Sequence, residues 1–354
     1  MLAAMNTLLR ALLCAALLWT AKDAHAASFD YLKSADGTPL CVYETGNPQG
    51  RELLFIHGFS QSYAVFKRQF DSDLAKDFRI VAFDLRGHGC SGKPWAEAAY
   101  TGTKVWADDV AAVIKARKLK QPLIVGWSFG GYVTIDYVRH YGVKDVAGLV
   151  LVGSNAGLPP APTDPAAIAR LNAQRDANRA LPPDIELQLR NGRQFVSLMT
   201  AKPAPQDMAD IMFATNQMMP PYARRAMSSL ALTNDDLTTK IAAPTFFMVG
   251  SRDMSQPNDV IRSVAAKMSN ASVQVFEGAG HALFDQAHGV APLGKLAGPE
   301  VTGHLDIGQQ RRPRGGFTCG DDEKGGEQGE HGRRGIRIRR TYGRTARPSR
   351  RGTV

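Results

Sequence analysis

Short apolar runs alternate with amphipathic segments along most of the chain. Each run ends within two residues of a glycine, as expected of strands that are buried on both faces of a sheet. Helical patterns over residues 105–119 and 132–141 lie between two pairs of runs. The predicted strands are residues 53–56, 79–85, 123–125, 146–152, 245–249 and 273–276. Strands that alternate with helices predict an α/β fold with a mostly parallel central sheet flanked by helices.

Two segments depart from this alternation. Residues 29–33 and 40–44 surround Asp36-Gly37 and predict a hairpin at the sheet edge. The segment 158–240 has no strand-like run, and it predicts a helical cap over the carboxyl ends of the strands, where ligands bind in such sheets. Its methionines either line an adaptable apolar pocket or pack the cap onto the sheet. They are Met199, Met208, Met212, Met218, Met219 and Met227.

The first 26 residues predict a signal peptide. Arg10 precedes an apolar run that ends at Trp19, and Ala24-His25-Ala26 provides small residues before a cleavage site after Ala26. A run of about nine apolar residues is too short for a membrane span, which needs roughly 20. We therefore expect a periplasmic or secreted protein with no membrane anchor after cleavage.

Composition and charge exclude a nucleic-acid-binding body as the first interpretation. The 354 residues are 44% hydrophobic and 21% charged, which suits a large folded core. The net charge is +10, but residues 290–354 hold 14 Lys and Arg against 7 Asp and Glu. The rest of the chain is therefore nearly neutral.

Three cysteines remain once Cys14 leaves with the signal peptide. They are Cys41, Cys90 and Cys319, and three cannot all pair within one chain. A Cys41–Cys90 disulfide and two unpaired, semi-buried thiols are both open alternatives. No cysteine or histidine cluster has the spacing of zinc ligands, so we expect no metal.

The chemistry is concentrated where strands end. Gly126-Trp127-Ser128-Phe129-Gly130 matches G-x-S-x-G between a strand and a helix, the context of a nucleophile elbow. A serine hydroxyl needs a base, and the base needs a carboxylate that fixes its tautomer. His281 and Asp253 follow the last two predicted strands. Their order, Ser128, Asp253, His281, predicts a catalytic triad.

Five motifs together give the chain a resemblance to a known family. They are His57-Gly58-Phe59, Asp84 to Gly89, Gly126 to Gly131, Gly250-Ser251-Arg252-Asp253 and Gly280-His281. Over about residues 29–288 the chain resembles serine-dependent α/β-hydrolases of the capped esterase and non-haem haloperoxidase-like group. The resemblance implies an oxyanion hole formed by the backbone N–H groups of Phe59 and Phe129. It assigns a core to residues 27–157 and 241–289, and a cap to residues 158–240.

Other polar residues at the strand ends are predicted to be structural. The resemblance implies that His57, His88, Asp84 and Arg86 brace loops. Asp108 and Asp109 are expected on a solvated helix face or at a helix cap. Asn155 follows a strand at a fallback position for the acid, but an amide cannot replace the Asp253 carboxylate.

The predicted function is that of an exported serine hydrolase. It would cleave small carboxylic esters, thioesters or lactones through an acyl-enzyme on Ser128, with no cofactor. A perhydrolase, a C–C bond hydrolase, an iminopeptidase or a non-catalytic binding protein remain alternatives. An iminopeptidase would need a cap carboxylate for the substrate amine, and the candidates are Glu186, Asp207 and Asp210. The expected partner is a small-molecule ester, and the oligomeric state is left open.

Residues 290–354 depart from the resemblance. Related proteins close with an amphipathic helix soon after the catalytic histidine, whereas here the apolar period stops after Gly289. The glycine- and arginine-rich composition predicts disorder. A shifted reading frame and a functional segment that attracts RNA or anionic lipid are the two explanations considered.

Overall fold

The computed structural model describes residues 27–179 and 184–286. Within them, the strands form one sheet in the order β1-β2-β4-β3-β5-β6-β7-β8. The strands are β1 (Ser28–Lys33), β2 (Pro39–Gly46), β3 (Arg51–Ile56), β4 (Phe78–Phe83), β5 (Leu123–Trp127), β6 (Gly148–Val152), β7 (Thr245–Gly250) and β8 (Ala271–Phe276). β2 runs antiparallel to both neighbours, and the pairs from β4 to β8 are parallel. The mostly parallel sheet with an edge hairpin is thus confirmed.

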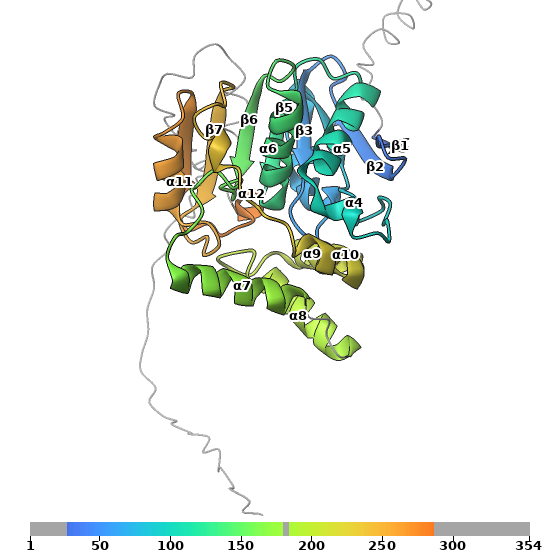
Figure 1. The fold of residues 1–354 in the computed structure, drawn as a ribbon. Coiled ribbons are helices and arrows are strands. Elements are labelled where there is room, and N and C mark those ends of the chain that lie inside the picture. The colour runs from blue at the N-terminus through green and yellow to red at the C-terminus, as the bar shows by residue number, and fades with distance from the viewer. Residues whose placement is uncertain (1–26, 180–183, 287–354) are drawn as a thin grey trace, which may run out of the picture. The chain divides into compact units, whose positions relative to one another are not determined.

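Alternate side chains of the strands build two apolar layers, because successive residues of a strand point to opposite faces. Leu54 of β3 packs in one layer with Val110 and Ile135. These come from α5 (Thr103–Ala116) and α6 (Phe129–Tyr141), which lie with α11 (Asn258–Ala265) on one face (Figure 1). Phe55 packs in the other layer with Phe66 and Leu283. That face carries η1 (Tyr63–Phe66), α2 (Lys67–Phe70) and α12 (Leu283–Gln286), and the short helices α3 (Leu74–Asp77) and α4 (Ala98–Thr101) complete the core.

Helices fill the long segment between β6 and β7, as its lack of strand patterns predicted. They are α7 (Pro165–Arg179), α8 (Ile185–Ser197), α9 (Gln206–Gln217), α10 (Pro221–Met227) and η2 (Asp235–Leu237), and Figure 1 shows α7 to α10 beyond one end of the sheet. We call residues 158–240 the cap segment. Most of its six methionines pack in the two apolar layers, whereas Met218 is exposed and Met227 also reaches a cavity. Packing is therefore their main role.

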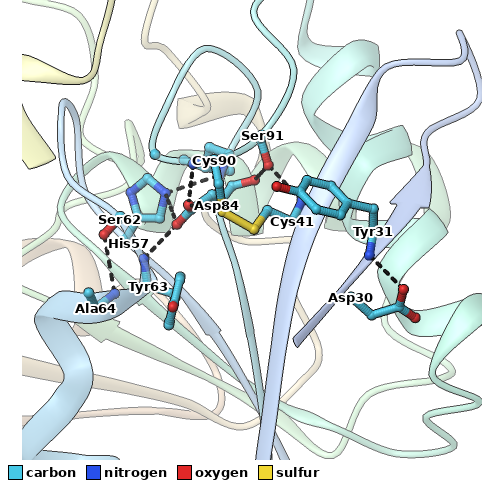
Figure 2. The surroundings of a disulfide bond; sticks show 12 residues. Asp30, Tyr31, Cys41, His57, Ser62, Tyr63, Ala64, Asp84, Cys90 and Ser91 are labelled. Atoms are coloured by element: carbon cyan, nitrogen blue, oxygen red, sulfur yellow. Dashed lines mark hydrogen bonds and ion pairs between the residues drawn. A yellow bond between two sulfur atoms is a disulfide. The ribbon is translucent and has the colours of Figure 1, made fainter. Parts of the chain in front are cut away.

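A disulfide joins Cys41 of β2 to Cys90, which follows β4, with a Cα–Cα distance of 5.7 Å (Figure 2). Of the two alternatives that the sequence left open, the structure contains the paired form. None of the described helices combines the length and apolarity needed to span a membrane. The predicted signal peptide and the segment 290–354 lie outside the described residues.

Candidate active site

Ser128 occupies a strained turn between β5 and α6. Its backbone has φ 53° and ψ −117°, a conformation that side-chain-bearing residues rarely adopt. The flanking glycines are required by contact: a Cβ on Gly126 would lie 2.5 Å from the Gly130 carbonyl oxygen, and one on Gly130 would lie 2.2 Å from that of Ile56. Ser128 is the N-cap residue of α6, yet its hydroxyl makes no capping hydrogen bond. The Ser128 hydroxyl is therefore not used to cap the helix and is free to take part in chemistry.

Asp253 and His281 meet at the carboxyl ends of β7 and β8. His281 Nδ1 lies 2.8 Å from Asp253 Oδ2, and both residues are 8% exposed. Gly153 follows directly after the neighbouring strand β6 and has φ 50°. A Cβ there would lie 3.2 Å from His281 Nδ1 and 3.3 Å from Asp253 Oδ2. A glycine at this position thus leaves space for the pair.

The electrostatics of this pair favour a charged carboxylate. Burial raises the pKa of the Asp253 carboxyl, but the hydrogen bonds from His281 and Ser255 outweigh it and bring the pKa below its ordinary value. Sequence reasoning missed Ser255. Its hydroxyl lies 2.6 Å from Asp253 Oδ1 and 2.9 Å from His281 Nδ1, and its backbone N–H donates to Asp253 Oδ1 at 2.9 Å. A serine two residues after an aspartate is typical of such a turn and was the available signal.

Trp127 links Ser128 to the Asp253–His281 pair. Its indole N–H donates to the His281 carbonyl oxygen at 3.1 Å, and its ring lies 5.6 Å from the imidazole, measured between centroids. Ser128 is the next residue on the chain, so the structure brings the nucleophile elbow and the pair into one region. The Ser128 hydroxyl makes no hydrogen bond with any described residue.

Phe59 and Phe129, whose backbone N–H groups are predicted to form an oxyanion hole, each lie next to Ser128 or next to a residue that borders it. Phe129 opens α6, so its N–H is one of the first-turn donors that a helix cannot satisfy internally. Gly58, before Phe59, packs so closely that a Cβ on it would lie 3.0 Å from the Ser128 Cβ. Neither N–H has an acceptor among the described residues. The arrangement suits binding of a negatively charged oxygen.

The histidines beside Gly58 and Gly87 are held within loops. The Leu85 N–H donates to His57 Nε2 at 3.0 Å, and His57 Nδ1 lies 2.8 Å from the Gly58 carbonyl oxygen. His88 Nδ1 contacts the Arg86 carbonyl oxygen at 2.9 Å. Both rings are buried, and burial lowers the pKa of His57 to about 4 and that of His88 well below its ordinary value. These contacts fit the predicted bracing role.

The expectation for Asp109 was wrong. It lies on α5 as expected, but it is fully buried instead of solvated. Arg86 forms a bidentate pair with it, at 2.7 Å from Nε and 2.6 Å from Nη2, and also donates to Asp36 at 2.8 Å. The buried guanidinium of Arg86 needs both carboxylates, which is why Asp109 is drawn into the core.

A cavity of about 620 Å³ opens at Ser128. Its lining includes Phe59 and Phe129 from the core, Ile168 and Leu171 from α7, and Met227 from α10. Asn155 also lines it, and its Oδ1 accepts from the Tyr132 hydroxyl at 2.9 Å. No Asp, Glu, Lys, Arg or His belongs to the described lining. The volume and the apolar walls are typical of small-molecule sites.

One group of potential metal ligands occurs among the described residues. Cys41, Asp84 and Cys90 place one ligand atom each within 4.8 Å of the others. The two sulfur atoms are joined in the disulfide, so neither is available as a thiolate ligand. These residues therefore do not fit a metal site in this state.

Comparisons with known proteins identify the family and the fold. The sequence model of the alpha/beta hydrolase family matches residues 53–293. The chain is 27% identical over 260 residues to the AB hydrolase superfamily protein YisY of Bacillus subtilis (strain 168), covering 72% of this chain and 92% of that protein.

Two solved structures extend the likeness. One is an esterase from Rhodococcus sp. ECU1013, with a TM-score of 0.63 and 27% identity over 76% of this chain and 96% of that one. The other is a proposed aryl esterase from Burkholderia cenocepacia, with a TM-score of 0.63 and 26% identity over 76% of this chain and 95% of that one. The chain belongs to the alpha/beta hydrolase family.

Proposed function

We propose that the chain is a serine esterase that cleaves small, uncharged carboxylic esters. The observation that carries the proposal is the hydrogen-bonded Asp253–His281 pair, which the Trp127 indole ties to the residue before Ser128. Ser128 itself lines an uncharged cavity. The esterases among its structural relatives, at 26% and 27% identity, support the same reaction class.

In the proposed mechanism, Ser128 Oγ attacks the ester carbonyl carbon while His281 Nε2 accepts the hydroxyl proton. Asp253 holds the imidazole by its Nδ1–H and stabilises the imidazolium. The carbonyl oxygen becomes an oxyanion that accepts from the Phe59 and Phe129 N–H groups, and one such donor contributes about 2.7–4 kcal/mol. His281 then protonates the leaving alcohol, and water cleaves the acyl-enzyme by the same steps in reverse.

The cavity lining favours a neutral substrate over an amine-bearing one. An iminopeptidase would need a carboxylate close to the substrate amine. None of the three candidates belongs to the described lining of the cavity: Asp207 lies 3.4 Å from Arg68 Nη2, Asp210 accepts from Gln206 at 2.7 Å, and Glu186 is on α8. Thioesters and lactones undergo the same acyl transfer and remain within the proposal.

We also propose that the chain acts in the periplasm or outside the cell. The Cys41–Cys90 disulfide supports this location, because disulfides persist in oxidising compartments and are rare in the cytosol. N-terminal sequencing of protein from a periplasmic or culture fraction should give Ala27 as the first residue. Recovery of the intact N-terminus in the cytosol alone would contradict the proposal.

Activity-based labelling tests the esterase proposal. We expect a fluorophosphonate probe to label the full-length chain on Ser128, and Ser128→Ala to lose both the labelling and the hydrolysis of p-nitrophenyl esters. A panel of esters, thioesters, lactones and aminoacyl amides, with a peroxide-dependent assay alongside, then separates the alternatives. Labelling that survives Ser128→Ala, or amides cleaved faster than esters, would overturn the proposal.

A further inference from the structure

Buried polar contacts join the loop of residues 58–62 to cap helix α9. Asn216 Nδ2 donates to Ser60 Oγ at 2.7 Å. Gln61 Nε2 donates to the Met212 carbonyl oxygen at 3.2 Å, and Thr215 Oγ1 lies 3.1 Å from Gln61 Oε1. The loop that carries Phe59 is therefore held from the cap side by specific hydrogen bonds.

These groups are hidden from water on both sides of the contact. Ser60 and Gln61 are 0% exposed, and Thr215 and Asn216 are 7% and 4% exposed. A buried polar group that loses its partner cannot turn to solvent, so it bears the full cost of desolvation. The contacts between α9 and the loop thus specify one arrangement of the two elements.

The loop needs such support because its backbone is strained. Ser60 has φ 54°, in the left-handed region that favours glycine. A side-chain-bearing residue persists there only when its surroundings over-determine the conformation. The Asn216 bond to the Ser60 hydroxyl is a direct restraint on this residue, which is next to Phe59.

Further cap residues fix Asn216 and Phe59. Gln217 Nε2 donates to Asn216 Oδ1 at 2.9 Å, which sets the orientation of the Asn216 amide. Arg224 of α10 donates from Nη2 to the Asn216 carbonyl oxygen at 3.2 Å. Its guanidinium also lies over the Phe59 ring, 5.3 Å from the centroid. The Arg224 guanidinium thus contacts both Asn216 on α9 and Phe59 on the loop.

We propose that Asn216 is a positioning residue for catalysis: through Ser60 it holds the loop in the conformation that directs the Phe59 N–H at the substrate oxyanion. The cap then has a part in the chemical step besides forming a wall of the cavity. This inference rests on the proposed esterase function.

Kinetics of Asn216→Ala test the proposal. The misdirected Phe59 N–H should lower kcat by between about 10- and 100-fold while KM changes little, because the donor acts on the transition state more than on the bound ester. The Ki of a trifluoromethyl ketone, whose adduct on Ser128 bears an oxyanion, should rise by the same factor as kcat falls. A merely structural role would instead raise KM and lower Tm without a selective effect on this inhibitor.

Companion variants keep the test decisive. Asn216→Asp can accept a hydrogen bond from the Ser60 hydroxyl and should restore much of kcat. Asn191→Ala alters an exposed asparagine on α8 and should match the wild type. If Asn216→Ala does not fold, Ser60→Ala removes the other partner and should reproduce the loss of kcat. In a double-mutant cycle the two losses should not add.

The outcomes separate this inference from the function on which it rests. Unchanged kcat and inhibitor affinity in both Asn216→Ala and Ser60→Ala, with normal labelling of Ser128, would overturn the positioning role and leave the esterase intact. Absence of labelling and ester hydrolysis in the wild type would remove the esterase proposal itself, and this inference with it.

Discussion

Two histidine–aspartate pairs lie in the described part of the chain, and they differ in the surroundings of the Nε2 ring nitrogen. In both, Nδ1 carries the proton: His281 donates it to Asp253, and His57 to the Gly58 carbonyl oxygen. The Leu85 N–H donates a hydrogen bond to His57 Nε2 at 3.0 Å. Nε2 of His281 has no partner among the described residues. Both nitrogens of the His57 imidazole are thus hydrogen-bonded to backbone groups. The His281 imidazole keeps Nε2 available to accept a proton from a substrate or from Ser128.

The carboxylates differ in a corresponding way. Burial raises the pKa of Asp84 to about 6, despite backbone hydrogen bonds from Tyr63 and Cys90. Its Oδ1 is 3.8 Å from His57 Nε2, too far for a hydrogen bond (Figure 2). Asp253 contacts its histidine at 2.8 Å and has a lowered pKa. The two pairs share their residue types, so hydrogen-bond geometry is what distinguishes the bracing pair from the pair that we propose to be catalytic.

The largest expected effect distinguishes the two aspartates. Asp253→Asn should lower kcat by about 10⁴-fold, because the amide stabilises the wrong tautomer of the His281 imidazole and no imidazolium. Asp84→Asn should leave kcat within about tenfold of the wild type. Ester hydrolysis by the two variants, each checked for folding by circular dichroism, measures the contrast. Equal losses of kcat in the two variants would contradict the proposed difference between Asp253 and Asp84.

The disulfide should matter for stability more than for chemistry. Cys41 and Cys90 are 49 residues apart, and closing a loop of this length stabilises a fold by about 4 kcal/mol in the chain-entropy treatment. The double variant Cys41→Ala, Cys90→Ala should lose a free energy of unfolding of this order while KM stays close to the wild type. Denaturant unfolding gives the energy. An unchanged midpoint would show that β2 and the loop after β4 do not need the link.

A pH effect should follow from the raised pKa of Asp84. Its carboxyl has a pKa of about 6 in the folded chain against an ordinary 3.8, so the folded state holds the proton more tightly. The protonated Asp84 carboxyl therefore adds about 3 kcal/mol to the free energy of unfolding. This contribution is fully present below pH 3.8 and is lost as the pH rises through 6. Relative to Asp84→Asn, the wild type should gain about that free energy of unfolding between pH 7.5 and pH 3. A stability difference that does not vary with pH would contradict this account.

The smallest expected effect concerns Ser255. Removing its hydroxyl takes one hydrogen bond from the charged Asp253 carboxylate and leaves the backbone bond, so Ser255→Ala should lower kcat by about tenfold, or roughly 1.4 kcal/mol. Ser272→Ala, at an exposed position on β8, is the matched control. Steady-state kinetics at several pH values check the loss. Full activity of Ser255→Ala would show that the Ser255 hydroxyl is not needed, and that the backbone N–H and His281 are enough to hold Asp253.

The strand pattern and the G-x-S-x-G motif predicted most of the fold and the position of Ser128, because both follow from local spacing. Burial of Asp109 could not be predicted that way, since it depends on contact with Arg86 from the loop after β4. The Cys41–Cys90 bond remained one of two alternatives because it depends on the distance between β2 and the loop after β4. The contact of Asn216 with Ser60 spans 156 residues, and no local pattern encodes it.

The most direct test of the account is a crystal structure of the full-length chain after reaction with a fluorophosphonate. We predict a covalent bond from phosphorus to Ser128 Oγ, a phosphoryl oxygen about 2.7–3.1 Å from the N–H groups of Phe59 and Phe129, and His281 Nε2 facing the adduct with Asp253 behind the ring. An adduct on another residue, or a His281 ring turned away from the phosphorylated serine, would contradict the central claim.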